Sequence, residues 1–269
     1  MNAQANGRAM SAEPHHNRPA VDLIQVVQRL IVALESETLN PFELNGFKRA
    51  AARMRLEEPD LAFCILGIVA GIERRIDDMN RDFRNAMRHA PSSWEIRYIY
   101  ANTLLLLGFY SCSAEVARDT CHCYPCYSSL LNSLIQACYR AGRMAEASRW
   151  IEHWEEKREG EFHSLTQNVM RLKAFYRDND LDDDRVERLQ DTAATLAHES
   201  GAFPREIRMS LVHEGAQDHL LCEMILRDDI SPERMADMER TLRQRIQQDE
   251  TIADLTDRVV FGYTLCLTS

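Results

Sequence analysis

The densest group of possible metal ligands in the sequence is Cys121, His122, Cys123 and Cys126. Thiolates and imidazoles bind zinc, and a structural zinc site usually combines two separated ligand pairs that close a tetrahedron around the ion. Cys123 and Cys126 form one C-x2-C pair, but the sequence contains no second pair of this kind. Free cysteines also pack as small apolar side chains. The pattern favours packed thiols over a zinc site, and we expect no metal and no cofactor.

A second candidate for chemistry is the group of His213, Glu214 and His219 near the C-terminus. The zinc-protease motif places two histidines four residues apart on one helix, so that both rings reach the metal. Here six positions separate the histidines, and Gly215 interrupts the segment. A hairpin loop is the better interpretation, and an enzyme with its site at these three residues is the alternative. We name no catalytic residue, because the sequence contains no phosphate-binding glycine loop and no nucleophile motif.

The charge balance of the chain narrows its partners. The 269 residues include 32 Lys and Arg against 42 Asp and Glu, which gives a formal net charge of −10. A general nucleic-acid binder needs clustered basic side chains. We therefore expect no nucleic-acid binding, whereas a basic protein partner is compatible with this charge.

The N-terminal residues carry no sign of export. Residues 1–18 lack the apolar centre of a secretion signal, and we predict a disordered tail there. The most apolar early stretch, 21–34, contains charged and polar residues and is too short to cross a bilayer. The sequence therefore predicts a cytoplasmic protein without membrane association, in which the eight cysteines are reduced.

In the middle of the chain, similar residues recur 34 positions apart. The pairs are Pro91 and Pro125, Gly108 and Gly142, Leu104 and Cys138, and Ser113 and Ala147. Each glycine stands between two apolar runs, where a turn between helices is expected. A period of this length is typical of two-helix units that stack side by side.

The segment from about 60 to 160 resembles a tetratricopeptide repeat array. That family's motif combines an aromatic, Leu and Gly in its first helix with small residues, an aromatic and a closing Pro in its second. The three units match at Phe63, Leu66, Gly67, Phe83, Ala86 and Pro91, then at Tyr100, Ala101, Leu104, Gly108, Ser113, Ala117 and Pro125, and then at Leu131, Leu134, Cys138, Gly142, Ala147 and Ile151. The matches fail at Arg97 in the second unit and at Trp154 and Glu159 in the third. The resemblance implies stacked helix pairs with one shared core, because no pair buries its apolar face alone.

Helical spacing of apolar residues extends this array at both ends. Residues 19–59 are predicted to form an N-terminal helical cap, whose second helix would begin at Pro41. Two further helices, 162–176 and 186–198, would form a degenerate fourth unit, so we assign residues 60–203 to the repeats.

From about residue 204 the apolar residues alternate instead. The alternating positions are Ile207, Met209 and Leu211, then Leu220, Cys222, Met224 and Leu226, and finally Phe261, Tyr263, Leu265 and Leu267. Alternation indicates strands, and Ser231 followed by Pro232 indicates a helix start between the second and third of them. The predicted fold class is therefore mainly α, a TPR-like α-solenoid followed by a small α+β module, strand–strand–helix–strand, over 204–269. Further solenoid helices are the alternative, and an open last strand would allow a homodimer through Phe261 and Tyr263.

The resemblance to tetratricopeptide arrays also implies a concave groove, lined by the first helix of each unit, in which a peptide or partner protein binds. Asn and Gln side chains can bond a peptide backbone, and Tyr gives contact area at a low entropic cost. Cys64, Ser129 and Ser133 stand where a clamp for a C-terminal carboxylate would need basic residues, so we expect no such clamp. Cys64 and Ile68 face the groove in the first unit, and the predicted partner-binding residues are Tyr98, Asn102, Leu105, Ser129, Asn132, Gln136 and Tyr139.

These observations predict a protein-interaction scaffold of the adaptor, secretion-chaperone or regulator type, by analogy with bacterial proteins of this architecture. The first alternative is an acidic inhibitor or immunity-type protein that covers a basic partner, and the second is the enzyme described above. Salt separates the scaffold from the inhibitor, because association steered by charge slows in salt while groove binding changes little.

Overall fold

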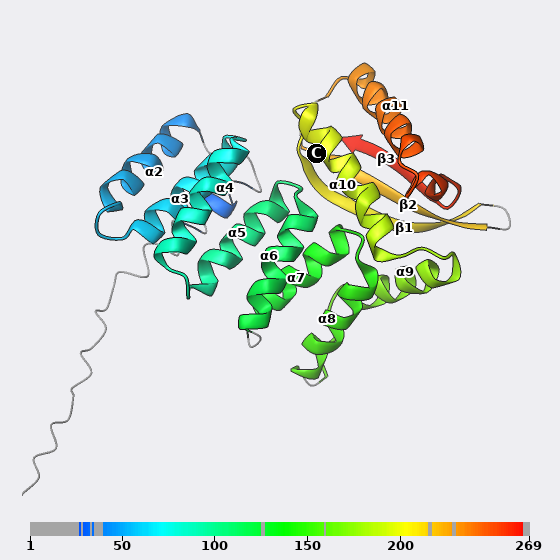
Figure 1. The fold of residues 1–269 in the computed structure, drawn as a ribbon, viewed down its shortest axis with the longest axis horizontal. Helices are drawn as coiled ribbons and strands as arrows, with labels where there is room; N and C mark the ends of the chain where they lie inside the picture. Colours follow the sequence, from blue (N-terminus) through cyan, green and yellow to red (C-terminus); the bar gives the residue numbers. More distant parts are fainter. Residues whose placement is uncertain are drawn as a thin grey trace, which may run out of the picture.

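The computed structural model of the protein describes residues 27, 29–32, 34, 40–124, 127–158, 160–214, 217–227 and 230–265. It is mainly helical, with a three-stranded sheet near the C-terminus (Figure 1), which confirms the predicted fold class. The predicted tail, 1–18, lies outside the described residues. No helix in the described ranges is long and apolar enough to cross a membrane.

Helices at the N-terminus precede the repeats. Val27, Leu30 and Leu34 have helical backbone and are buried. Helix α2 (Pro41–Met54) begins at the predicted proline. Its start is fixed by a capping box, in which the Asn40 side chain accepts the N–H of Glu43 while the Glu43 carboxylate accepts the N–H of Asn40.

Three antiparallel helix pairs follow. They are α3 (Pro59–Ile72) with α4 (Ile76–His89), α5 (Trp94–Leu106) with α6 (Tyr110–Cys123), and α7 (Ser128–Arg140) with α8 (Met144–Glu156). Each pair packs against the next, and the first helices α3, α5 and α7 also contact one another in sequence (Figure 1). These contacts place the first helices in one layer, as in a solenoid.

The turns inside the three pairs share one backbone geometry. Each contains a residue in the left-handed region, with φ of 59° at Arg74, 83° at Gly108 and 81° at Gly142. The next residue donates its N–H to the carbonyl five positions back, at distances of 2.8–2.9 Å: Arg75 to Ala70, Phe109 to Leu104, and Arg143 to Cys138. This is the Schellman ending of a helix. The period of 34 is therefore a property of the turns as well as of the apolar faces.

We expect Gly142→Ala to lower the free energy of unfolding by about 2–3 kcal/mol, because it adds overpacking to backbone strain. A Cβ at position 142 would lie 2.8 Å from Cγ1 of Val186. Gly160 is a matched control, since its φ is also 81° but no atom lies within 4 Å of its Cβ position. Gly160→Ala should cost only the strain of about 1 kcal/mol. Equal losses for the two variants in urea denaturation would contradict the packing of α10 on this turn.

The predicted fourth unit has both of its helices but not the packing of a repeat. Helix α9 (Thr166–Asp178) lies against α8, and the following turn again has a left-handed residue, Asp180, with φ of 55°. Helix α10 (Asp183–Glu199) then leaves α9 and packs against α6, α8 and α11 and against the first two strands (Figure 1). Helix α10 thus connects the repeats to the sheet.

The C-terminal elements have the predicted order of strand, strand, helix and strand. Strands β1 (Pro204–Glu214) and β2 (Gln217–Leu226) form an antiparallel hairpin. Helix α11 (Pro232–Gln248) and a 3-10 helix, η1 (Ala253–Asp257), lead to β3 (Val259–Leu265), which pairs with β2 in parallel. The strand order is β1-β2-β3, so β3 is at an edge of the described sheet. The homodimer through Phe261 and Tyr263 stays a prediction.

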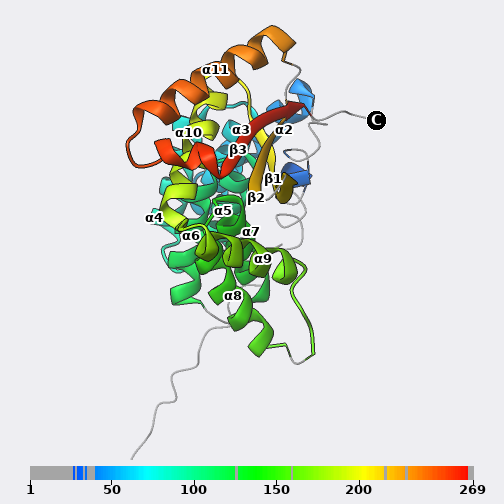
Figure 2. The ribbon, with the colours of Figure 1, turned by 90° about the vertical axis from the view of Figure 1, so that its right-hand side faces the viewer.

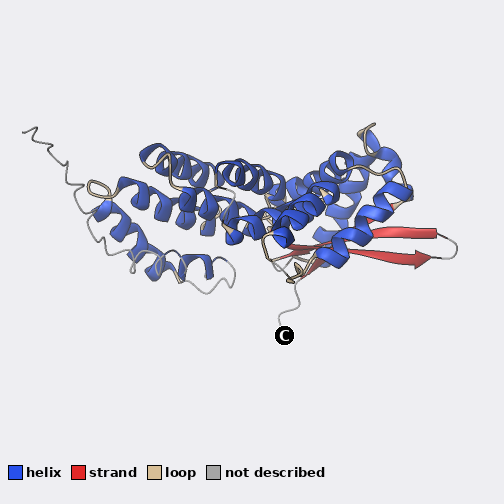
Figure 3. Ribbon diagram, turned by 90° about the horizontal axis from the view of Figure 1, so that it is seen from below, coloured by secondary structure: helices blue, strands red, loops and turns tan. Residues whose placement is uncertain are grey.

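The sheet shares its core with the repeats. Most of the alternating residues predicted for the inner face are buried, namely Ile207, Met209, Leu220, Cys222, Met224, Leu226 and Tyr263, and they belong to one apolar cluster with buried residues of α5–α11. Leu211, Phe261 and Leu265 are partly buried and pack against this cluster, and Leu267 lies outside the described residues. Figure 2 shows α11 beside α10 and β3. Figure 3 shows the strands as a layer on one side of the helices, with the β1–β2 hairpin extending past them.

Candidate functional site

The predicted groove residues lie on α3, α5 and α7, and their exposure differs from one end of these helices to the other. Ser129 and Asn132 near the start of α7 are exposed, whereas Leu105 and Tyr139 near the ends of α5 and α7 are buried. The half-buried residues are Tyr98, Asn102 and Gln136, and Cys64 and Ile68 on α3 are buried.

The sheet and its flanking segments cover the C-terminal ends of these helices. Pro204, at the start of β1, packs so closely on the α5–α6 turn that a Cβ on Gly108 would lie 2.7 Å from its ring. Arg227, which follows β2, donates to the carbonyl of Leu106 at 2.7 Å. β1 also contacts α7, and burial there raises the pKa of Tyr139. Leu105 and Tyr139 therefore belong to the interior, and of the seven predicted residues Tyr98, Asn102, Ser129, Asn132 and Gln136 remain at the surface.

Two aromatic residues that the sequence analysis did not select extend this surface. Trp94 begins α5, and its ring stacks on that of Tyr127 at 4.0 Å and lies 6.1 Å from that of Tyr98. Tyr127 directly precedes α7 and is 41% exposed. Trp94 stands one helical turn before Tyr98, a spacing that could have been used to find it. We call the combined set the aromatic–amide surface: Trp94, Tyr98, Asn102, Tyr127, Ser129, Asn132 and Gln136.

Hydrogen bonds orient the two asparagine amides of the aromatic–amide surface. Oδ1 of Asn102 accepts the hydroxyl of Ser133 at 2.6 Å. Oδ1 of Asn132 lies 2.8 Å from Nε2 of His163. Because Nδ1 of His163 accepts the N–H of Leu165, Nε2 carries the proton and donates it to Asn132. The amides are therefore positioned before any partner arrives, which lowers the entropic cost of binding.

The aromatic–amide surface carries no formal charge of its own, although the chain has a net charge of −10. Burial lowers the pKa of His163 below the ordinary value of 6.5, so its ring stays neutral near pH 7. The residues of this surface therefore present neutral polar groups and apolar rings.

Two histidines, the buried His163 and the half-buried His198, make the stability of the fold depend on pH. Burial lowers the pKa of His163 and of His198, whose Nε2 donates to the carbonyl of Leu107 at 2.9 Å. The contribution of these rings to the free energy of unfolding is fully present above pH 6.5. It is lost as the pH falls, because the histidines of the unfolded chain bind protons at a higher pH than those of the folded chain. Asp191 acts in the opposite direction, since burial raises its pKa to about 6 and the folded chain then binds the extra proton.

We therefore expect the urea midpoint to fall between about pH 7 and pH 5, and to fall more steeply in Asp191→Asn, which lacks the opposing carboxyl. The double variant His163→Gln, His198→Asn should abolish this fall, because its side chains do not titrate in this range and Asp191 then stabilises the fold on acidification. A wild-type profile that rises on acidification would contradict the burial of the two rings.

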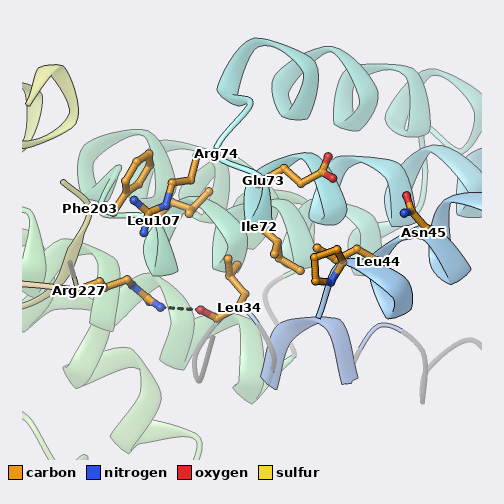
Figure 4. Close-up of a pocket in the computed structure, with 11 residues that line it drawn as sticks. Leu34, Leu44, Asn45, Ile72, Glu73, Arg74, Leu107, Phe203 and Arg227 are labelled. Carbon is orange, nitrogen blue, oxygen red and sulfur yellow. Dashed lines mark hydrogen bonds between the residues drawn. The ribbon is translucent and has the colours of Figure 1, made fainter. Parts of the chain in front are cut away.

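A pocket of about 420 Å³ lies between α2, the α3–α4 turn and the segment before β1 (Figure 4). Arg74 lies over the ring of Phe203 at 4.6 Å, and Arg227 donates to the carbonyl of Leu34. Leu44, Ile72 and Leu107 form apolar walls. The two arginines thus connect the N-terminal helices to the segments that flank the strands, and their contacts stabilise the fold.

The two groups of candidate chemical residues lie at the end of α6 and on the β1–β2 hairpin. His213 pairs with Asp218 across the hairpin and is exposed, while the side chain of Glu214 lies outside the description. Burial raises the pKa of Cys121 to about 12, Cys123 is exposed, and Cys126 lies outside the described residues. Among the residues with described positions, no three His, Cys, Asp or Glu side chains are grouped to hold a metal ion.

The fold and the site together define a TPR-like α-solenoid with an uncharged aromatic–amide surface on its first-helix layer. No protein-family model matches the chain, and no curated protein matches it. A solved structure of a mutant of MamA is 14% identical and aligns with 66% of this chain and 97% of its own, with a TM-score of 0.37. Because a TM-score this low carries no argument for a shared fold, the class of this protein rests on its own helix pairs and turns.

Proposed function

We propose that the protein is an interaction scaffold that binds an extended segment of another protein on the aromatic–amide surface. The observation that carries this proposal is the difference in exposure between the two ends of the first helices. The sheet covers the C-terminal ends of α5 and α7, and aromatic rings and preorganised amides occupy the part that stays open. Rings with few rotatable bonds and adaptable amides are typical of binding surfaces. An adaptor, secretion chaperone or regulator would use such a surface.

The second candidate is an acidic inhibitor that covers a basic partner, and the net charge of −10 favours it. The two candidates use different parts of the molecule, since the aromatic–amide surface is uncharged. Binding there would change little with added salt, whereas capture through the acidic outer surface would weaken steeply.

The test is affinity capture from an extract of the source cells, with wild type and the double variant Tyr98→Ala, Asn132→Ala compared at low and high salt. We expect one protein to be lost selectively from the double variant, with affinity reduced about tenfold or more. The control is Arg149→Ala, Glu152→Ala, two exposed positions on α8, which should capture as much as wild type. Circular dichroism verifies that both variants are folded.

Equal capture by the double variant and wild type would overturn the assignment to this surface. Capture that disappears in high salt for every variant would support the acidic inhibitor instead.

A further inference from the structure

Successive first helices give the aromatic–amide surface a regular spacing. α5 and α7 lie side by side in one layer, and the axes of packed helices are about 8–10 Å apart. A polyproline II helix rises about 3.1 Å per residue with three residues per turn, so one turn advances about 9 Å. A β-strand returns to the same face after about 6.6 Å. A segment in the polyproline II conformation that crosses the layer therefore presents the same face to α5 and α7, and a strand does not.

The two asparagine amides of the aromatic–amide surface are free to donate hydrogen bonds. The Oδ1 atoms of Asn102 and Asn132 are occupied by Ser133 and His163. Within the part of the chain that the structure describes, the Nδ2 groups of both amides make no hydrogen bond, so they can donate to a partner. A segment rich in proline offers carbonyl acceptors but few N–H groups, because each proline lacks that donor. Donors on the surface and acceptors on the segment are complementary.

The aromatic rings suit the same kind of segment. The stacked pair of Trp94 and Tyr127 presents flat apolar surface at the start of α5 and α7, with Tyr98 one turn further along α5. Pyrrolidine rings pack well on such surfaces, and aromatic-lined grooves are a recurrent way to recognise polyproline II segments. The preformed conformation of the segment also reduces the entropy lost on binding.

We infer that the partner of the aromatic–amide surface is an uncharged, proline-containing segment in the polyproline II conformation. This inference rests on the proposed function, because it names the chemistry of the segment bound at the same surface.

The test measures fluorescence anisotropy with a labelled peptide of ten prolines and the full-length protein. A glycine–serine peptide of equal length serves as the control ligand. We expect the proline peptide to bind at least tenfold more tightly than the control peptide, with little change on adding salt, and to compete with the captured partner.

The decisive variants are Asn102→Asp and Asn132→Asp combined. Aspartate keeps the oxygen that accepts from Ser133 or His163 but lacks the Nδ2 donors, so the fold is retained while the donors to the segment are removed. We expect at least a tenfold loss of affinity for the proline peptide. Gln244→Glu, an exposed site on α11, makes the same kind of amide-to-carboxylate change away from the surface and should leave affinity unchanged.

The outcomes separate the inference from the proposed function. If the proline peptide does not bind while capture of the partner still depends on Tyr98 and Asn132, the inference is overturned and the scaffold function stands. If neither depends on the surface, both fail. Equal affinity of wild type and the double aspartate variant would also overturn the inference.

Discussion

Replacing Arg143 with methionine is expected to lower the free energy of unfolding by about 3–5 kcal/mol, because it leaves buried carboxylates without their cation. The Arg143 side chain is only 10% exposed. It donates to both carboxylate oxygens of Glu187 in α10, with 2.7 Å to Oε2, and its Nη1 lies 3.5 Å from Oε2 of Glu146 in α8. Both glutamate side chains are themselves mostly buried.

Arg143, Glu187, Glu146 and Arg118 form one network of ion pairs, and Glu146 depends on both of its cations. Burial alone would raise the pKa of Glu146, but hydrogen bonds from Arg118 and Trp150 and the positive charge of the arginines lower it. Arg118 holds the carboxylate with two bonds, at 2.6 and 2.7 Å. Without Arg143, one of the two opposing charges disappears while Glu187 loses its direct partner.

The matched control for Arg143→Met is Arg149→Met, because Arg149 is an exposed residue of α8, the helix that Arg143 directly precedes. We expect the control to change stability by less than about 0.5 kcal/mol. The double variant Arg143→Met, Glu187→Gln should lose less than Arg143→Met alone, since it also removes a stranded charge. Urea denaturation measures all three, and equal losses for Arg143→Met and Arg149→Met would contradict a buried network.

The sequence predicts the local features of the fold well. Gly108 and Gly142 mark two of the left-handed turns, and alternation at Ile207 and Met209 marks a buried strand face, because both signals lie within a few residues. Arg74 occupies the equivalent left-handed position in the first pair. This turn cannot be recognised from the sequence, because glycine is the usual residue at such a position. The pairing of Arg143 with Glu187, 44 positions apart, has no local signal.

The candidate site was predictable only in part, and for a physical reason. The resemblance places Tyr98 and Asn132 on the first helices, but it contains no information about where a sheet outside the repeats will pack. The burial of Leu105 and Tyr139 depends on that packing. Trp94 was missed because it lies at the first position of its helix, outside the positions that the resemblance carries over.

We expect Phe83→Ala to lower the free energy of unfolding by about 3–5 kcal/mol. The Phe83 side chain is fully buried in the first repeat, and its ring centre lies 4.7 Å from that of Tyr100 in the next. Truncation would remove apolar surface from both repeats and leave a cavity at their junction. Phe42, on α2 and 77% exposed, is the control, and Phe42→Ala should cost less than about 0.5 kcal/mol.

The close approach of Phe83 to Gly67 allows a test that truncation alone does not provide. A Cβ on Gly67 would lie 2.8 Å from Cδ2 of Phe83, so Gly67→Ala should force the ring to shift and cost about 1–3 kcal/mol. In a Phe83→Leu background the smaller side chain leaves room, and the same substitution should cost less. The difference is the coupling energy of the two positions. Strictly additive losses would mean that the two residues do not touch, which would contradict the packing of α4 against α3.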